Sequence, residues 1–360
     1  MDKNDLNALL RTMVERDASD LYLTTGAQPQ VKVHGVVHNL TLPAFDAGQV
    51  RTLAYSTLSP KAIADYERDL ECNLAYAPPG VGRFRLNIYQ QRGETAMVAR
   101  RIHEQIPSFE KLGLPDGVRQ LALLPRGLVL IIGAAGSGKT TTMASMVDYR
   151  AMQHAGHILT VEDPIEYHFT HGKSSVDQRE VGIDTHSFSD ALRNAMRQAP
   201  DLIVIGEIRD RESMQQALAY AETGHLCIST LHASNASQAI KRILNFFPES
   251  AHAQLLMDLS LNLQAVLAQR LVPGMRGGRV LATEVLLHSA HVADLIQRGA
   301  VDELRRALEQ TSVMGTHSFD QSLLALFQQG HITQDEALAN ADSRTDLGLR
   351  MRLHSAHDPH

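Results

Sequence analysis

The stretch GAAGSGKT, residues 133–140, has the residue types and the spacing of a loop that binds phosphate. Its three glycines would let the backbone fold tightly enough for N–H groups to point at phosphate oxygens. Lys139 would reach the β and γ phosphates of a nucleoside triphosphate, and the Thr140 hydroxyl would bind Mg²⁺. A chance match occurs in roughly one chain of this length in a hundred, so the pattern predicts nucleotide binding. The predicted binding residues are Gly133, Ala134, Ala135, Gly136, Ser137, Gly138, Lys139, Thr140 and Thr141.

Carboxylates follow two apolar segments further along the chain. The run LIVIGEIRD passes through one glycine into Glu207, and TVEDPIE ends another apolar run with Glu162 and Asp163. A lone acidic residue after a strand is usually a helix cap or a solvated turn. Two of them, in a chain that also holds a phosphate loop, favour hydrolysis, which needs metal ligands and a group that orients water. We expect Glu207 to orient the attacking water and Glu162 to lie near the metal.

The protein ligands of Mg²⁺ follow less directly from the sequence. Gly206 stands where an aspartate usually ends the third strand of such a site. We expect the metal-binding duty of that aspartate to pass to Glu207, to Asp163 or to a water molecule, with Thr140 as a further ligand.

A parallel sheet would bring these residues together. From Gly127 the sequence alternates continuous apolar strands with helices, which indicates a parallel sheet covered on both faces. Such sheets bind ligands at the carboxyl ends of their strands, where the phosphate loop and Glu207 stand. The expected strands cover 127–133, 157–163, 201–207 and 225–230, and the expected helices begin near 139 and cover 188–200 and 211–224.

The first hundred residues have a different pattern, typical of an α+β domain. The run RFRLNIY alternates so that Phe84, Leu86 and Ile88 share one face of a strand while arginines occupy the other. Gly93 separates this strand from the next, which makes the pair a hairpin candidate. We expect helices over 4–16 and 47–69, and strands at 19–24, 30–37, 82–91 and 94–102.

These patterns divide the chain. The segment between the two regions carries three prolines and two glycines amid short apolar pieces, so it is interpreted as a linker. The terminal run HSAHDPH has no ligand spacing of a zinc site, and the end of the chain is interpreted as a solvated, disordered tail. The expected parts are an α+β domain over 1–102, a linker over 103–126, an α/β core over 127–285, a helical region over 286–344 and the tail over 345–360.

Composition excludes several classes of protein. With 360 residues, 44% of them apolar, the chain can bury a core in each of two domains. Cys72 and Cys227 are the only cysteines, so neither a disulfide framework nor a cysteine zinc site is supported. The net charge of −6 argues against a nucleic-acid partner. The N-terminus is charged and no apolar stretch approaches the roughly 20 residues of a membrane span, so we expect a cytosolic protein.

Four stretches together carry a specific resemblance. GAAGSGKTT, TVEDPIE, RQAPDLIVIGEIRD and ETGHLCISTLHA resemble, in order, the Walker A motif, acidic box, Walker B motif and histidine box of the type II/IV secretion ATPase superfamily. DASDLYLTTG, GRFRLN, QREVG, NFFPE and LLMDLSLNLQAVLAQRLV extend the likeness to pilus retraction ATPases of the PilT and PilU type over nearly the whole chain. The tail ALANADSRTDLGLRMRL favours the PilU branch.

The resemblance implies a homohexameric ring. Each subunit would have a PAS-like N-terminal domain and a RecA-like C-terminal domain, with ATP between them. The implied protein is a cytoplasmic motor, peripheral to the inner membrane at the pilus base, that hydrolyses ATP to retract pili and drive twitching motility. Its implied partners are a PilT-like ATPase and the inner-membrane pilus platform protein.

The resemblance also assigns roles to residues. It implies arginine fingers at Arg83, Arg85 and Arg100, whose guanidinium groups would stabilise charge that develops on the γ phosphate. A solvated strand that carries basic residues is the alternative. The resemblance further implies that His225 and His232 sense the γ phosphate, although a histidine that begins a strand is more often a hydrogen-bonded core residue.

One motif departs from the family pattern. PilT-type motors carry AIRNLIRE near their C-terminus, and the matching stretch here is HVADLIQR, residues 291–298. Ala293, Asp294 and Gln297 replace residues of that motif, which favours an accessory motor beside a PilT-like partner. The alternatives are an ATP-binding regulatory ring with little hydrolysis and a pilus assembly or secretion motor. The latter usually has a tetracysteine zinc element, which two cysteines do not provide.

Overall fold

The chain folds as two compact units. The structure, a computed structural model, describes residues 3–33, 35–102, 105–310 and 313–355. The N-terminal unit comprises Met1–Gln105 and Ile165–His168, and the C-terminal unit comprises Ile106–Pro164 and Phe169–His360. The α/β fold class expected from the sequence, with an α+β region before a mainly parallel sheet and C-terminal helices, is confirmed.

A six-stranded antiparallel sheet forms the centre of the N-terminal unit, in the order β3-β2-β1-β6-β5-β4. Helix α1 begins after Asp5, which caps it, and buries Leu6, Leu9, Leu10 and Met13, the spacing of one helix face. The elements of this unit are α1 (Leu6–Glu15), β1 (Asp20–Leu23), β2 (Gln30–Val33), β3 (Val36–Asn39), α2 (Gln49–Tyr55), α3 (Pro60–Asp69), β4 (Glu71–Tyr76), β5 (Arg83–Gln91) and β6 (Glu94–Ile102).

Strands β5 and β6 form the expected hairpin. Arg92 and Gly93 make its turn with φ of +51° and +79°. Positive φ at both central residues matches the twist of the flanking strands in two-residue hairpins. Phe84, Leu86 and Ile88 are fully buried, so the face predicted to be apolar is the core face of this sheet.

Two expected elements of the N-terminal unit are each divided in two. The strand expected over 30–37 is the antiparallel pair β2 and β3, which are joined through Gly35 at φ +86°. The helix expected over 47–69 is α2 and α3, because Ser59 caps a new helix that Pro60 begins. Strand β4 escaped prediction because its residues are only exposed or half-buried and form no apolar run.

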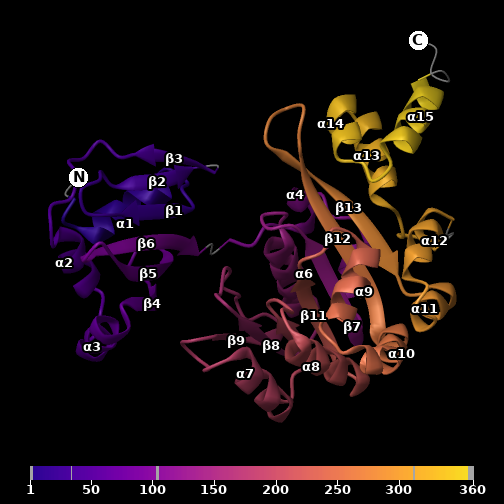
Figure 1. Cartoon of the computed structure of the whole chain (residues 1–360), viewed down its shortest axis with the longest axis horizontal. Helices are drawn as coiled ribbons and strands as arrows, with labels where there is room; N and C mark the ends of the chain where they lie inside the picture. The colour runs from indigo at the N-terminus through magenta and orange to yellow at the C-terminus, as the bar shows by residue number, and fades with distance from the viewer. Residues whose placement is uncertain (1–2, 34, 103–104, 311–312, 356–360) are drawn as a thin grey trace. The chain divides into compact units, whose positions relative to one another are not determined.

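A seven-stranded sheet organises the C-terminal unit, in the order β13-β12-β7-β11-β10-β8-β9 (Figure 1). Its neighbouring strands run parallel except β12 and β13, which are antiparallel. Every residue of β7, β10 and β11 is buried, so both faces of the sheet are covered as expected. The strands are β7 (Gly127–Gly133), β8 (Gly156–Glu162), β9 (Ser174–Glu180), β10 (Leu202–Ile205), β11 (Leu226–Leu231), β12 (Leu263–Pro273) and β13 (Arg279–Leu287).

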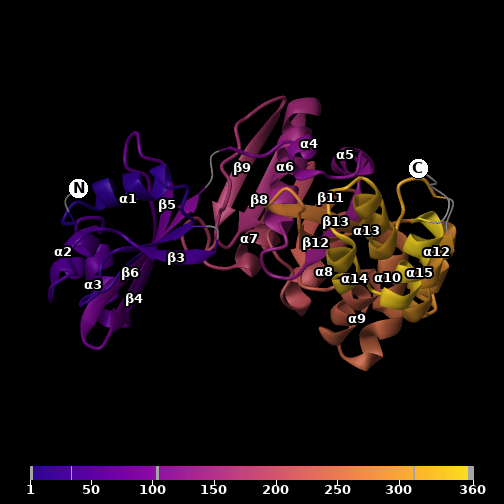
Figure 2. The same cartoon turned by 90° about the horizontal axis from the view of Figure 1, so that it is seen from above.

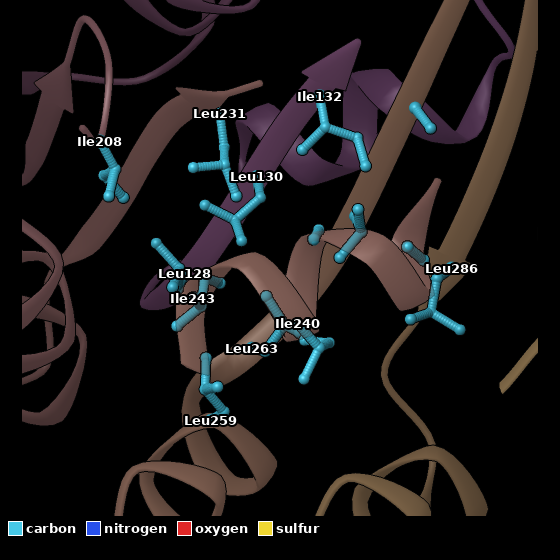
Figure 3. Packing of buried hydrophobic residues seen from close by; sticks show 14 of the residues in the cluster. Leu128, Leu130, Ile132, Ile208, Leu231, Ile240, Ile243, Leu259, Leu263 and Leu286 are labelled. Carbon is cyan, nitrogen blue, oxygen red and sulfur yellow. The ribbon is translucent and has the colours of Figure 1, made fainter. Parts of the chain in front are cut away.

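Helices cover this sheet and share its apolar core. Figure 3 shows part of one cluster, which includes Leu128, Leu130 and Ile132 of β7 and Ile240 and Ile243 of α9. Within the described ranges, none of the helices is long and apolar enough to span a membrane. The helices are α4 (Phe109–Leu112), α5 (Gly117–Ala122), α6 (Lys139–Gln153), α7 (Phe188–Ala195), α8 (Arg211–Glu222), α9 (Ala236–Asn245), α10 (His252–Asn262), α11 (Ala290–Gln297), α12 (Leu304–Gln310), α13 (Phe319–Gln328), α14 (Gln334–Ala339) and α15 (Arg344–Ser355), with short 3₁₀ turns at Met196–Gln198, Glu249–Ala251 and Val301–Glu303.

The segment expected as a linker, 103–126, is largely part of the C-terminal unit. Helices α4 and α5 bury Phe109, Val118 and Leu121, and the segment belongs to this unit from residue 106 to its end at 126. Gly113 and Pro115 lie between the two short helices, and Pro107 and Pro125 flank the pair, so these residues bound helices rather than mark a solvated connection. Residues 103–104 lie outside the described residues.

The expectation of a disordered tail over 345–360 is wrong for residues 345–355, which form most of helix α15. Leu347 and Met351, one helical turn apart, are buried in the same cluster as the sheet. Two apolar residues on one face suffice because α13, α14 and α15 pack against one another, as both views show (Figures 1 and 2). Residues 356–360 lie outside the described residues.

The burial of α15 generates a direct test. Leu347→Ala removes a fully buried side chain, so we expect the free energy of unfolding of the C-terminal unit to fall by about 2–4 kcal/mol. Leu349→Ala is the matched control on the same helix, where the side chain is 52% exposed. We expect that change to stay within about 0.5 kcal/mol. Urea denaturation followed by circular dichroism measures both, and equal, negligible effects would show that α15 is not part of the core.

Candidate nucleotide-binding and hydrolysis site

The carboxyl ends of four neighbouring parallel strands form the candidate site. Strand β7 lies beside β11, β11 beside β10, and β10 beside β8. The phosphate loop, residues 133–140, begins at the last residue of β7, and His232 directly follows β11. Glu207 follows β10, and Glu162 ends β8. Because the four strands are parallel, these segments lie at one edge of the sheet, which we call the carboxyl edge.

The shape of the phosphate loop depends on glycine. A Cβ on Gly133 would stand 2.7 Å from the carbonyl oxygen of Gln269 and closer still to the hydroxyl of Ser137, so no side chain fits there. Gly138 has φ +88° and leads directly into the 15-residue helix α6. The start of the loop therefore packs closely against β12 and the Ser137 side chain, and the loop ends at a helix N-terminus, where positive potential favours an anion.

Two side chains of the loop fit a phosphate ligand. The Ser137 hydroxyl is buried and has no hydrogen-bond partner in the part of the chain that the structure describes. The Lys139 ammonium is also buried and donates to the carbonyl oxygens of Gly133 and Ala134 at 3.0 and 2.9 Å. The loop thus holds the Ser137 hydroxyl, which lacks a hydrogen-bond partner among the described residues, and the Lys139 ammonium, which donates to carbonyl oxygens of the loop itself. Phosphate oxygens could accept hydrogen bonds from both groups.

A chain of contacts joins the phosphate loop to the predicted catalytic carboxylate. The Lys139 Nζ lies 3.5 Å from Nδ1 of His232, and Nε2 of the same ring lies 3.2 Å from a carboxylate oxygen of Glu207. Glu207 has no proton to offer when ionised, so the network assigns the ring proton to Nε2 and leaves Nδ1 to accept from Lys139. His232 therefore bridges the cation and the acid.

Arg209 is a site residue that sequence reasoning did not select. Its guanidinium donates to Glu207 at 2.8 Å and to Asp163 at 3.2 Å, and so ties the ends of β10 and β8 together. The hydrogen bond to Glu207 is the main cause that raises the pKa of Arg209, which keeps it charged. Its place two residues after Glu207 could have signalled it, but spacing alone does not say which way an arginine in a turn points.

Glu162 is the last residue of β8 and is surrounded by polar groups. Its side chain is buried, and one carboxylate oxygen accepts from the Thr160 hydroxyl at 2.6 Å and from the Gln178 amide at 3.2 Å. These partners lie on β8 and β9, at the far side of β8 from the phosphate loop. These contacts join Glu162 to its own strand and to β9, and its place near the metal stays a prediction.

The predicted Mg²⁺ ligands lie at the carboxyl edge on different segments. Thr140 is the second residue of α6, while Asp163 and Glu207 follow β8 and β10 and share Arg209. No group of three or more histidine, cysteine or acidic side chains suited to a metal occurs among the described residues. The donor set thus matches an ion held by a hydroxyl, phosphate oxygens and water, the manner in which Mg²⁺ is commonly bound, rather than a protein-only cage.

His225 lies away from the predicted site residues at the carboxyl edge. It precedes β11, and its carbonyl oxygen accepts from the N–H of Gly127, the first residue of β7. The length of β11 therefore separates His225 from His232, about 20 Å at the usual rise per residue. The His225 ring contacts the Thr223 hydroxyl at 3.1 Å, so within one chain the structure brings only His232 to the phosphate loop.

The predicted arginine fingers share one face of the N-terminal sheet. Arg85 and Arg100 are direct cross-strand partners on β5 and β6, and Arg83 lies two residues along on the same face. Arg100 donates to the buried carboxylate of Asp20 at 2.8 Å, while its own side chain remains 61% exposed. Arg101 points to the other face and pairs with Asp17.

The fold and the site together define a P-loop nucleotide hydrolase of the RecA-like class. A parallel sheet presents a phosphate loop, and the neighbouring strands place a histidine and a carboxylate beside its lysine. The chain belongs to the Type II/IV secretion system protein family, whose model matches residues 3–337.

Comparisons with known proteins agree over nearly the full length. The chain is 48% identical over 355 residues to a Pseudomonas aeruginosa protein named type IV pilus ATPase PilU, covering 98% of this chain and 93% of that one. It is 38% identical over 337 residues to the P. aeruginosa type IV pilus retraction ATPase PilT, covering 94% and 98%. A crystal structure of the pilus retraction motor PilT with bound ADP matches with a TM-score of 0.89 and 40% identity, covering 96% of this chain and 99% of that chain. The resemblance that the sequence motifs carry is thus confirmed.

The crowding at Gly133 generates a test of the phosphate loop. We expect Gly133→Ala to weaken nucleotide binding by about tenfold or more, because the added Cβ displaces Ser137 or Gln269. Gly117→Ala is the matched control, since a Cβ there meets only open space. Titration with a fluorescent ADP analogue measures both affinities. Equal affinities would contradict the assignment of residues 133–140 as the phosphate site.

Proposed function

We propose that this chain is an ATPase motor that powers the retraction of type IV pili. The observation that carries the proposal is the contact chain from Lys139 through His232 to Glu207, because it joins the phosphate loop to the carboxylate that would orient water. The names of two relatives support it, since both are type IV pilus ATPases and one is named for retraction.

Each residue at the carboxyl edge has a proposed part in hydrolysis. The N–H groups of the phosphate loop and Lys139 bind the phosphates of ATP, the substrate. Glu207 accepts a hydrogen bond from the attacking water and aligns it with the γ phosphate. The His232 Nε2–H holds the Glu207 carboxylate in that orientation. Mg²⁺, held by Thr140 and through water by Glu207 or Asp163, neutralises charge on the phosphates when it is bound.

The arginines of the N-terminal unit are the proposed arginine fingers, a role that rests on the family resemblance. Arg83, Arg85 and Arg100 share one sheet face, and a guanidinium brought to the γ phosphate would stabilise the charge that develops during transfer. Hydrolysis and phosphate release remove that anionic partner. The two units can then rotate relative to each other, which turns a change of charge into movement.

The proposed assembly is a homohexameric ring, peripheral at the cytoplasmic face of the inner membrane. Its proposed partners are the pilus platform protein and a PilT-like ATPase, beside which the chain acts as an accessory motor. Helix α11 supports the accessory role: Asp294 and Arg298 form an ion pair at 2.7 Å on its exposed face, while Val292, Leu295 and Ile296 are buried. This region therefore carries Arg298 in an ion pair, while Ala293 and Gln297 stand where the PilT-type motif has arginines.

Glu207→Gln tests the hydrolytic role. We expect ATP turnover to fall by about a hundredfold or more while nucleotide affinity is retained, because the amide can no longer accept the proton that the water loses. Glu212→Gln is the matched control, since that exposed glutamate on α8 pairs with Arg193 of α7 and is not part of the contact chain from Lys139 to Glu207. Phosphate release assays and nucleotide titration give the two quantities.

Two outcomes of that assay would contradict the proposal. Unchanged turnover in Glu207→Gln would show that another group orients the water. A wild-type chain that binds ATP without measurable turnover would favour a regulatory ring over a motor.

The cellular role has its own test. We expect cells that lack the gene to keep surface pili but to retract them less often or with less force, and the wild-type gene to restore retraction where Glu207→Gln does not. Fluorescently labelled pili and an optical trap measure frequency and force. A deletion of the PilT-like gene in the same host is the comparison. Loss of an accessory motor is expected to reduce retraction force without abolishing retraction. Loss of surface pili would instead indicate an assembly motor.

A further inference from the structure

A short loop joins the proposed catalytic histidine to a helix that the proposed mechanism does not use. Residues 232–235, which we call the His232 loop, connect the end of β11 to helix α9, whose first residue is Ala236. His232 at one end contacts Lys139 and Glu207. Asn235 at the other end caps α9 by accepting from the N–H of Gln238. A movement of the start of α9 therefore moves the histidine.

Glu284 holds the start of that helix. Its carboxylate, on β13, accepts from the N–H of Ala236 at 2.8 Å, and the side chain is only 2% exposed. Burial raises the pKa of Glu284 to about 7, against the opposing effects of the Ala236 N–H and the guanidinium groups of Arg270 and Arg305. A buried acid is costly to keep, and this one does not belong to the hydrolytic chain of contacts.

Arg270, on β12, joins the same loop to the C-terminal helices. One guanidinium nitrogen lies 3.5 Å from the carbonyl oxygen of Ser234 and 2.6 Å from the carboxylate of Asp342. The other donates to the carbonyl oxygen of Asn340 at 2.7 Å, and the guanidinium stacks 3.8 Å from the centre of the Phe319 ring. Arg270 thus contacts the His232 loop and the segment between α14 and α15 at once.

Strand register places these two groups level with the phosphate loop. Gln269 of β12 lies opposite Gly133 of β7, and Ala268 lies opposite both Ile132 of β7 and Glu284 of β13. The sheet is therefore a common frame: it carries the phosphate loop on β7 and the two groups that hold the His232 loop on β12 and β13. A displacement of about 1 Å at a catalytic group can cost about a hundredfold in rate, so this frame bears directly on hydrolysis.

We propose that Glu284 and Arg270 are positioning residues for ATP hydrolysis: they hold the His232 loop so that His232 orients Glu207. Arg270 also links this loop to the segment between α14 and α15, so the C-terminal helices influence the turnover rate. The inference rests on the proposed function in one respect, the role of His232 beside Glu207. A brace that merely stabilises the fold is the competing explanation, and the two make different kinetic predictions.

Glu284→Met separates the explanations, because methionine keeps the volume of the side chain and removes the acceptor. At pH 8, above the pKa of Glu284, we expect kcat for ATP hydrolysis to fall about tenfold with KM changed less than about twofold. Glu284→Gln retains an oxygen acceptor and restores most of the rate. Thr283→Val is the matched control. Thr283 is the neighbour of Glu284 on β13, and the change removes its hydrogen bond to His317 without touching the His232 loop.

A double-mutant cycle decides whether Glu284 acts through the histidine. In a His232→Ala background we expect Glu284→Met to cause no further loss of kcat, because the group it positions is gone. A tenfold loss in both backgrounds, or wild-type kcat in the single variant, would overturn the proposal. Asp342→Asn provides a second variant at a half-buried position, and we expect it to lower kcat severalfold with KM unchanged. Unchanged kcat there would overturn the link to the C-terminal helices.

A readout without catalysis separates this inference from the proposed function. If the wild-type chain hydrolyses no ATP, or if Glu207→Gln has no effect, the proposed function fails whatever Glu284 does. Hydrogen exchange of the backbone amides from 232 to 240, measured with bound ADP, then tests the hold on the loop directly. We expect faster exchange in Glu284→Met than in the wild type or Thr283→Val, and equal exchange in all three would overturn the inference.

Discussion

The parallel pairing of β7, β11, β10 and β8 is the constraint on which the site depends. Register places Ile132 opposite Leu231, and Ile205 opposite both Ser229 and Val161. The phosphate loop, His232, Glu207 and Asp163 come directly after these levels, so the backbone hydrogen bonds of the sheet bring four distant parts of the sequence to one edge. Burial on both faces maintains this pairing, because a slip of one residue would exchange the two packed faces of a strand.

The same sheet also holds the site from its other side. Strand β12 lies beside β7 and places Gln269 next to Gly133, and the Gln269 side-chain amide donates to the hydroxyl of Thr142 in α6 at 2.7 Å. The phosphate loop is thus fixed between a strand and a helix. Strand β13 adds Glu284, which reaches the helix after the His232 loop. The antiparallel edge of the sheet therefore supports both loops that meet at Lys139. Strand β12 lies against the phosphate loop, and β13 holds the helix that follows the His232 loop.

Sequence reasoning predicted what local patterns determine. The phosphate loop, the apolar strands and the alternation along β5 each follow from residue types a few positions apart, and the structure has all three. The pairing of Glu207 with His232 required knowledge of strand order, which no local pattern contains. The same reason explains why sequence reasoning missed Arg209, Glu284 and Arg270. Each is placed at the site by a contact with a residue more than 40 positions away in the sequence. Helix α15 was missed because only two buried residues mark its inner face, and the helices they pack against lie earlier in the chain.

The guanidinium of Arg209 between Glu207 and Asp163 has a consequence for how the polyanionic substrate arrives. Two bare carboxylates at the mouth of the site would repel a triphosphate, and its capture would then depend steeply on ionic strength. Arg209 is shared between the two acids, and Lys139 and the amino end of α6 add further positive charge at this edge, so these groups offset part of that repulsion. Under the proposed function, the chain can therefore hold Glu207 permanently in place without slowing the binding of the next nucleotide.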